Sequence, residues 1–367
     1  MKFLFGGNKT KQAKSAIDKM AKQRDMDGLS NALMDPDWQI REYAAGTFEQ
    51  IGAPDDPSIK ARYLVAKRNF DEVLSLGDAA KEPLLLALVH SDPKVQFDAA
   101  DTLIKICNVD AIQPIIDSIP DLDHRYVSNI AMLLGKFDDP ITADKLITAL
   151  KSSDVHVRWV ASYALGEMGD SRALSTLEQM AETDKGKTTE DGPVKNAARI
   201  AFQKIQWRDR PLEQLINALS NSDEFIRFGA ADTLGRRGDT SSIDTLINCL
   251  NDSSYMVRET VITALGKIGD ARAISSLTTI AKAKDGGPRW VAINAIEEIA
   301  GTPVDIFLDM LNDPNDRFTA VYRLRKSNDP RAISALERVL KEEKNEGIKE
   351  YARKSIEEIQ QRINDNK

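Results

Sequence analysis

Histidine and cysteine, the side chains most often used as metal ligands or nucleophiles, are scarce and widely separated in this chain. The three histidines are His90, His124 and His156, and the two cysteines are Cys107 and Cys249. Zinc needs nitrogen ligands at about 2 Å, whereas packed helices lie about 8–10 Å apart, so these histidines are expected in solvated loops. No C-x-x-C pair, phosphate-binding glycine loop or Ser/His/Asp arrangement is indicated. The sequence therefore predicts no metal, no cofactor and no catalytic residue.

Basic side chains recur along the chain at a nearly constant spacing. They define one reference position per unit, with a period near 31 residues that is lengthened twice by inserted segments. The reference residues are Arg41, Gln96, Val127, Arg158, Lys195, Arg227, Arg258, Arg289, Arg317 and Lys349. The residue four positions earlier is acidic in eight of these ten units. An acid there is typical of a helix N-cap, because its side-chain oxygen accepts hydrogen bonds from the first helical turn.

The basic reference residues are predicted to form a structural ladder. By helical geometry they lie about 50° from the centre of the apolar face, within reach of a capping aspartate of their own or an adjacent unit. Charge-assisted hydrogen bonds along the stack would follow. The alternative is a functional row of anion-binding cations. The ladder is predicted to contain Arg41, Arg158, Arg227, Arg258, Arg289, Arg317, Asp154, Asp223, Asp285 and Asp313.

Aromatic side chains gather one and five positions after the reference residues, which we call positions +1 and +5. Both positions point away from the apolar face of the expected helix. Aromatic side chains are common in protein interfaces, because they bury much area with few rotatable bonds. We therefore predict a partner-binding stripe; the alternative is that the rings cover neighbouring turns of the stack. The stripe is predicted to contain Phe97, Trp159, Tyr163, Phe228, Trp290, Phe318 and Tyr322.

Helices must carry these residues, because apolar side chains recur at positions -1, +3, +4, +7 and +10 of most units. These positions lie on one face of a helix. Gly-Asp pairs, such as Gly169-Asp170 and Gly269-Asp270, follow many of these segments and indicate helix ends. Each unit is thus a first helix, a capped turn and a second helix, which bury their apolar faces by stacking. We predict an all-α fold of about ten helix pairs, without a sheet and with helix content above roughly 60%.

The segment Asp154 to Asp170, and less fully Asp223 to Asp239, resembles the short repeats of the HEAT superfamily named after phycobilisome lyases. The resemblance implies a right-handed α-α superhelix whose second helices line a concave groove, so the aromatic stripe would face that groove. The family includes phycobilin lyases, which hold a tetrapyrrole and attach it to a client. In another HEAT enzyme, deoxyhypusine hydroxylase, repeated His-Glu pairs bind iron. Here Ser91, Arg125 and Val157 follow the histidines, so that signature is absent.

Two segments interrupt the regular spacing. Residues 57–77 continue a helical pattern and predict an extra helical segment, and polar residues 183–192 predict a loop insertion. Residues 1–25 predict a basic N-terminal capping helix, and residues 26–367 one continuous array. A solvated capping helix is favoured for residues 1–25 over weak contact with an anionic membrane, since terminal repeats need a polar outer face.

The charge balance bears on the class of partner. The formal net charge is -7, so the basic surplus typical of nucleic-acid-binding proteins is missing. Two isolated thiols and the lack of a long apolar run predict a cytoplasmic protein without a transmembrane segment. We expect a non-catalytic scaffold or adaptor that binds a protein partner in the concave groove. The alternative is a phycobilin-lyase-like or other client-modifying protein, which the family resemblance supplies and the residues do not.

Overall fold

The computed structural model describes residues 6–35, 37–88, 93–121, 127–137, 139–188, 192–283 and 287–365. Helices account for 79% of the structure, and these residues contain no strand. A single isolated bridge pairs Lys187 with Pro193. The expected all-α fold is confirmed.

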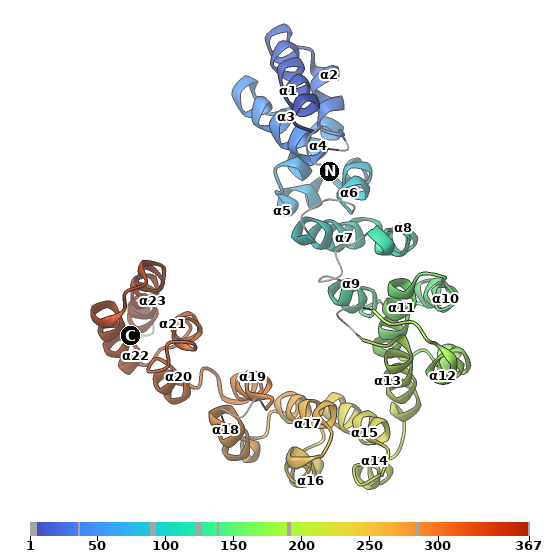
Figure 1. The fold of residues 1–367 in the computed structure, drawn as a ribbon, viewed down its shortest axis with the longest axis vertical. Helices are drawn as coiled ribbons and strands as arrows, with labels where there is room; N and C mark the ends of the chain where they lie inside the picture. The colour runs from blue at the N-terminus through green and yellow to red at the C-terminus, as the bar shows by residue number, and fades with distance from the viewer. Residues whose placement is uncertain are drawn as a thin grey trace. The chain divides into compact units, whose positions relative to one another are not determined.

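Contacts divide the chain into two compact units, residues 1–206 and 207–367. The first contains α1 (Gly6–Gln23), α2 (Met26–Ala32), α3 (Trp38–Ile51), α4 (Pro57–Ala66), α5 (Phe70–Val73), η1 (Leu74–Ala80), α6 (Lys81–Ala87), α7 (Pro93–Cys107), η2 (Asn108–Ala111), α8 (Ile112–Ser118), η3 (Ile119–Asp121), α9 (Val127–Leu134), α10 (Pro140–Ala149), α11 (Val155–Met168), η5 (Ser171–Ala173), α12 (Leu174–Thr183) and α13 (Val194–Trp207), whose last residue lies across the boundary (Figure 1).

The second unit contains α14 (Leu212–Ala218), α15 (Glu224–Arg237), η6 (Thr240–Ser242), α16 (Ile243–Asn248), η7 (Cys249–Asn251), α17 (Tyr255–Ile268), η8 (Ala271–Ala273), α18 (Ile274–Lys282), α19 (Arg289–Ala300), α20 (Val304–Met310), α21 (Arg317–Leu324), α22 (Pro330–Glu342) and α23 (Glu346–Asp365). The reference residues of both units lie in the second helix of a pair, from α3 to α23. Ten such pairs are present in the described residues, as the spacing predicts. Between the first two pairs, α4, α5 and η1 lie where the sequence predicts an extra helical segment.

The apolar faces of the helices form the core of each unit. In the first unit, Ile17 of α1 is buried with Leu29, Ala44 and Phe48, so the N-terminal helix shares a hydrophobic cluster with α2 and α3. A second cluster runs from Ala61 to Ile205. Whether residues 26–367 form one continuous array stays a prediction.

Aspartate caps begin several second helices as expected. Asp154 accepts hydrogen bonds from the backbone N–H groups of His156 at 2.8 Å and Val157 at 3.0 Å. Asp223 accepts one from Phe225 at 2.8 Å. The prediction is wrong for Asp313, because the helix begins later, at Arg317, and Asp316 is its N-cap residue. The predicted cap at Asp285 lies outside the described residues.

Several second helices pack closely at glycine eight positions after the reference residue. A Cβ added at Gly166 of α11 would lie 2.9 Å from the Cα of Ala201 in α13. One added at Gly235 of α15 would lie 2.6 Å from the Cα of Ala264 in α17. These distances are too short for real carbon atoms, so only glycine allows the two backbones to approach this closely.

Candidate interaction surfaces

Four exposed aromatic rings lie on three second helices of the second unit. Trp290 on α19 is 39% exposed, Phe318 and Tyr322 on α21 are 45% and 41% exposed, and Tyr351 on α23 is 42% exposed. The rings of Phe318 and Tyr351 meet edge to face, with centroids 5.2 Å apart. We call these four residues the aromatic surface. Three of them belong to the predicted stripe, and Tyr351 lies two positions after Lys349, outside the predicted pattern.

Charged side chains frame the aromatic surface and join its helices. Arg323 of α21 donates hydrogen bonds to Glu297 at 2.6 Å and Asn294 at 3.0 Å, both on α19. Arg289 lies over the ring of Trp290, with 5.7 Å between the guanidinium carbon and the ring centroid. The ion pair of Arg323 joins α19 to α21, and Trp290 and Phe318 both lie at position +1 of their helices.

Two residues of the predicted stripe are packed away from solvent. Trp159 on α11 is 8% exposed and Phe228 on α15 is 7% exposed, so the expectation that both rings point outward is wrong. Trp159 stacks on Tyr163 with centroids 5.5 Å apart, and Lys204 lies over Tyr163. Tyr163 and Phe97 are half-buried.

The close approach of second helices accounts for this difference. Both α11 and α15 carry a glycine at position +8 and pack tightly against the next second helix there. In α19 the equivalent residue is Glu297, which joins α21 through the long side chain of Arg323. Because α21 is joined to α19 through two long side chains, it covers less of the adjacent face of α19, which leaves Trp290 exposed. The Leu-Gly pair that ends at position +8, Leu165-Gly166 in α11 and Leu234-Gly235 in α15, is the signal that could have distinguished these rings.

Some of the reference arginines form ion pairs, but with carboxylates other than the predicted capping aspartates. Arg158 donates two hydrogen bonds to Asp184, at 2.7 and 3.1 Å, and Arg227 donates two to Asp252, at 2.7 and 2.8 Å. The same guanidinium groups donate to backbone carbonyls five and six residues before them. The capping aspartates are not the partners, because their oxygens accept backbone N–H groups of their own helix.

Two further reference arginines form such ion pairs, and we call each of these four arginine–carboxylate pairs a rung. Arg289 pairs with Asp316 and Arg317 with Glu343, both at 2.6 Å. In all four rungs the acid lies 25 to 27 residues after the arginine, next to the end or start of a helix in the following pair. Each rung therefore ties one helix pair to the next, which supports the structural role predicted for this row.

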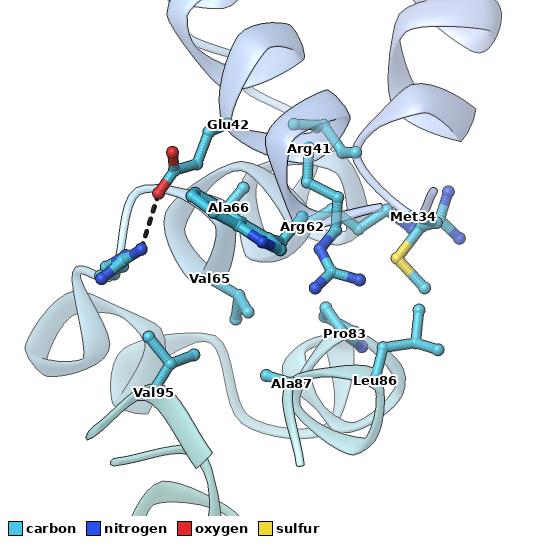
Figure 2. Close-up of a pocket in the computed structure, with 13 residues that line it drawn as sticks. Met34, Arg41, Glu42, Arg62, Val65, Ala66, Pro83, Leu86, Ala87 and Val95 are labelled. Atoms are coloured by element: carbon cyan, nitrogen blue, oxygen red, sulfur yellow. Dashed lines mark hydrogen bonds and ion pairs between the residues drawn. The ribbon is translucent and has the colours of Figure 1, made fainter. Parts of the chain in front are cut away.

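Arg41 and Arg258 have no carboxylate partner among the described residues. Arg258 donates to the carbonyl oxygens of Asp252 at 2.7 Å and Ser253 at 3.2 Å. Arg41 donates to the carbonyl of Asp35 at 2.9 Å, and the rest of its guanidinium points into a pocket beside Pro83 and Ala87 (Figure 2).

The rungs shift the pKa values of their groups. Burial raises the pKa values of Asp184 and Asp252. Hydrogen bonds from Arg158 and Arg227, backbone N–H groups and the arginine charges together outweigh it, so the pKa of each carboxyl is below its ordinary value. The hydrogen bond from Arg317, helped by backbone N–H groups of Asn345 and Lys344, lowers the pKa of Glu343 to about 2. These carboxylates remain ionised at neutral pH and keep the rungs intact.

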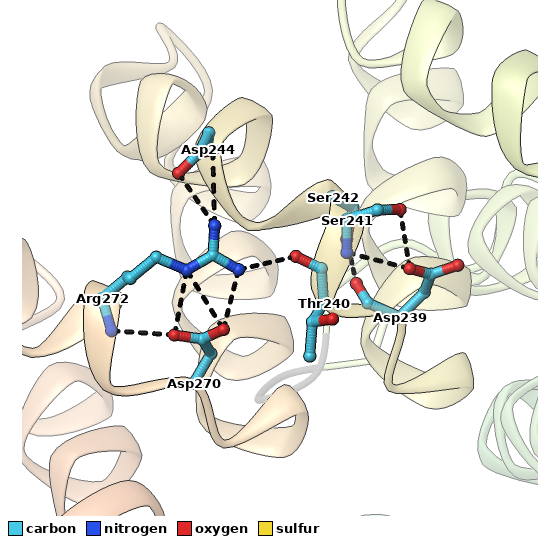
Figure 3. A network of polar contacts seen from close by, with 7 residues as sticks. All are labelled: Asp239, Thr240, Ser241, Ser242, Asp244, Asp270 and Arg272. Atoms are coloured by element: carbon cyan, nitrogen blue, oxygen red, sulfur yellow. Dashed lines mark hydrogen bonds and ion pairs between the residues drawn. The ribbon is translucent and has the colours of Figure 1, made fainter.

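A second arginine ladder was not predicted from the sequence. Arg272 donates to Asp270, two residues before it, at 2.8 Å, to Asp244 of the preceding pair at 3.4 Å and to the carbonyl of Thr240 at 2.9 Å (Figure 3). The same Asp-x-Arg arrangement holds Arg172 with Asp170 and Asp144, and Arg331 with Asp329 and Asp305. The recurring Asp-x-Arg triplet after the helix end is the signal that was missed.

The side chains weighed as ligands or nucleophiles do not gather. No group of three or more His, Cys, Asp or Glu side chains in the described part of the chain could hold a metal ion. His156 is half-buried in the first turn of α11, while His90 and His124 lie outside the described residues. Burial raises the pKa of the Cys249 thiol. In the described residues, no helix is both long and apolar enough to cross a bilayer.

Comparison with known proteins identifies the repeat. A family model of HEAT repeats matches residues 120–202 and 212–297. No curated protein sequence is a match to the chain. The complex of CpcE and CpcF of phycocyanin lyase from Nostoc sp. PCC7120 is 23% identical, over 63% of this chain and 97% of that chain, with a TM-score of 0.32.

Two other solved structures are similar over most of this chain. Human deoxyhypusine hydroxylase is 16% identical, over 94% of this chain and 99% of that chain, with a TM-score of 0.32. Importin beta is 15% identical, over 95% of this chain and 55% of that chain, with a TM-score of 0.39. At these identities the likeness concerns the fold alone.

Proposed function

Since residues 120–202 and 212–297 are HEAT repeats, we propose that this chain is a non-catalytic scaffold that binds a protein partner. The observation that carries the proposal is the aromatic surface, in which four large rings stay exposed on α19, α21 and α23. Leaving such rings in water is unfavourable, because each could bury a large apolar area against another surface.

The composition of the surface fits a protein ligand. Tryptophan, tyrosine and arginine are the residues that most often dominate the free energy of protein binding. Here they occur together, with Arg289 beside Trp290 and Arg325 lying 5.0 Å from the centroid of the Tyr322 ring. The rings lie on successive second helices, so a helix or an extended segment laid across those helices would contact several rings.

Affinity purification followed by mass spectrometry tests the proposal. The chain with Trp290→Ala and Phe318→Ala should capture at least tenfold less of its main partner than the unmodified chain, because truncating an aromatic anchor costs about 2–4 kcal/mol. Helical content measured by circular dichroism should not change, since both rings are exposed.

Tyr255→Ala is the matched control. Tyr255 is 47% exposed but lies at the start of α17, three residues before its reference residue, and is not part of the aromatic surface. Its removal should leave capture unchanged. Equal capture by all variants would show that the aromatic surface does not bind the partner. A purified protein that absorbs visible light would instead favour the tetrapyrrole-binding alternative.

A further inference from the structure

Arg41 of α3 occupies the reference position of its unit but lacks the acid found in four other units. In those rungs the acid lies 25 to 27 residues later. The same offset from Arg41 leads to residues 66–68, which are Ala66, Lys67 and Arg68. Lys67 is the C-cap residue of α4, just as Asp184, the partner of Arg158, is the C-cap residue of α12. Basic side chains thus stand where the other rungs have a carboxylate.

The two cations at the end of α4 form ion pairs with acids of α3. Lys67 pairs with Glu49 at 2.7 Å, and Arg68 pairs with Glu42 at 2.8 Å. Arg68 has a φ of 60°, a left-handed conformation that ends the helix. In the part of the chain that the structure describes, neither of these cations brings a carboxylate to the position opposite Arg41.

The space in front of Arg41 is a pocket with charged and apolar walls. About 20 Å³ of it can hold a water-sized group, and the remaining space is open to solvent. Arg41, Arg62 and Arg68 line it, and Glu42, the acid among its lining residues, is already paired with Arg68. Val65, Pro83 and Leu86 form apolar walls around the Arg41 guanidinium (Figure 2).

The guanidinium of Arg41 is only partly satisfied. One nitrogen donates to the carbonyl of Asp35, and the remaining N–H groups have no hydrogen-bond partner among the described residues. Burial lowers the pKa of Arg41, opposed by the charges of Asp35 and Asp37. By contrast, the hydrogen bonds that Arg158 donates to Asp184 and Arg227 donates to Asp252 raise the pKa values of these two arginines. A half-buried cation that donates to no carboxylate gains most from an added anion.

We propose that this pocket binds a carboxylate carried by an apolar peptide segment, which takes the place of the missing rung acid. The guanidinium of Arg41 holds the carboxylate, and the walls formed by Val65, Pro83 and Leu86 hold the adjoining aliphatic side chain. A carboxylate is the anion that this guanidinium geometry accepts in four other units of the same chain. The site does not depend on the aromatic surface, which lies in the other unit.

Three peptides separate the possible sources of the carboxylate. The first ends in Leu-Leu with a free C-terminal carboxylate, the second is the same peptide amidated, and the third is amidated but contains an internal Leu-Glu-Leu. Binding to the full chain is measured by titration calorimetry. Saturable binding of the first or the third, with at least tenfold weaker binding of the second, supports the proposal and identifies the source. Equal binding of all three overturns it, as does binding of inorganic phosphate without either acid.

Substitutions at the end of α4 provide the matched test. Lys67→Asp adds a carboxylate at the helix-end position that Asp184 occupies in its own rung, between the lining residues Ala66 and Arg68, and we expect this carboxylate to pair with Arg41. We expect it to weaken peptide binding at least tenfold and to raise the melting temperature relative to Lys67→Ala. Lys67→Ala also loses the pair with Glu49 but adds no acid, and should bind the peptide within about twofold of the unmodified chain.

Arg41→Ala should weaken peptide binding at least tenfold, whereas Trp290→Ala should not change it. If Arg41→Ala fails to fold, the difference in peptide binding between Lys67→Asp and Lys67→Ala still tests the proposal. Equal peptide binding by those two variants would overturn the proposal. Failure of Trp290→Ala to affect partner capture would overturn only the function proposed for the aromatic surface.

Discussion

The reference arginines differ in how much free energy each contributes, because only some of them hold a carboxylate. Arg227 and Asp252 form a bidentate pair in which the side chains are 11% and 9% exposed. Arg227→Ala leaves Asp252 buried without its counter-ion, so we expect the free energy of unfolding to fall by about 3 kcal/mol. Among the described residues, Arg258 makes hydrogen bonds to two backbone carbonyls and a contact with the Tyr255 ring, so Arg258→Ala should cost about 1 kcal/mol. Urea unfolding measures both.

Neither substitution should alter partner capture, because neither arginine belongs to the aromatic surface. Equal losses of stability for the two variants would mean that the pair with Asp252 contributes nothing beyond the carbonyl contacts. Lost capture with unchanged unfolding would assign this row to binding instead of to structure.

Glu343 makes the stability of the second unit depend on acid pH. Its pKa is lowered to about 2 by Arg317, from an ordinary value of 4.5. A lowered pKa means that the pair stabilises the folded state fully above pH 4.5 and that this contribution is lost as the pH falls toward 2. We expect Glu343→Gln to lower the melting temperature at pH 7, and the difference from the unmodified chain to shrink between pH 4.5 and 2. A difference that stays constant over this range would contradict the assignment.

At the scale of the helix, the glycine at position +8 sets how closely second helices pack. Gly235→Ala would place its Cβ 2.6 Å from the backbone of Ala264, so α15 and α17 would have to move apart. Overpacking of this kind costs about 1–3 kcal/mol. We therefore expect a lower free energy of unfolding in urea, together with greater exposure of Phe228, which this close packing helps to bury.

Gly46→Ala is the control for helix propensity. Gly46 lies inside α3, and an added Cβ would meet no atom within 4 Å. Alanine should therefore stabilise the chain by about 0.5–1 kcal/mol, because it restricts the unfolded backbone. Destabilisation by both substitutions would show that the close contact at Gly235 is not the cause.

The helix pairs could be predicted from the sequence because each unit repeats local signals. Apolar spacing, aspartate caps and Gly-Asp ends depend on residues within one helix, and they gave the ten pairs correctly. The partners of the arginines and the exposure of Trp159 depend on the neighbouring helix. Position +1 points away from its own apolar face, yet in α11 the next helix approaches closely at Gly166. The spacing of apolar residues within one helix does not indicate how closely the next helix approaches.

At the scale of the whole chain, the two candidate sites belong to different units. In the described part of the chain, every exposed large aromatic side chain lies within residues 207–367, from Tyr255 to Tyr351. The pocket at Arg41 lies within residues 1–206. Each site is built from neighbouring helix pairs of its own unit, so substitutions in one should act on that site alone.

The rungs also bear on how fast the chain can fold. Each joins residues only 25 to 28 positions apart, whether it lies at Arg158 or at Arg317. The entropy lost in closing such a loop is therefore nearly the same at every rung. Folding slows as the mean sequence separation of contacts grows. Because another helix pair adds contacts of the same short range, lengthening this chain by one repeat would leave that separation, in residues, almost unchanged.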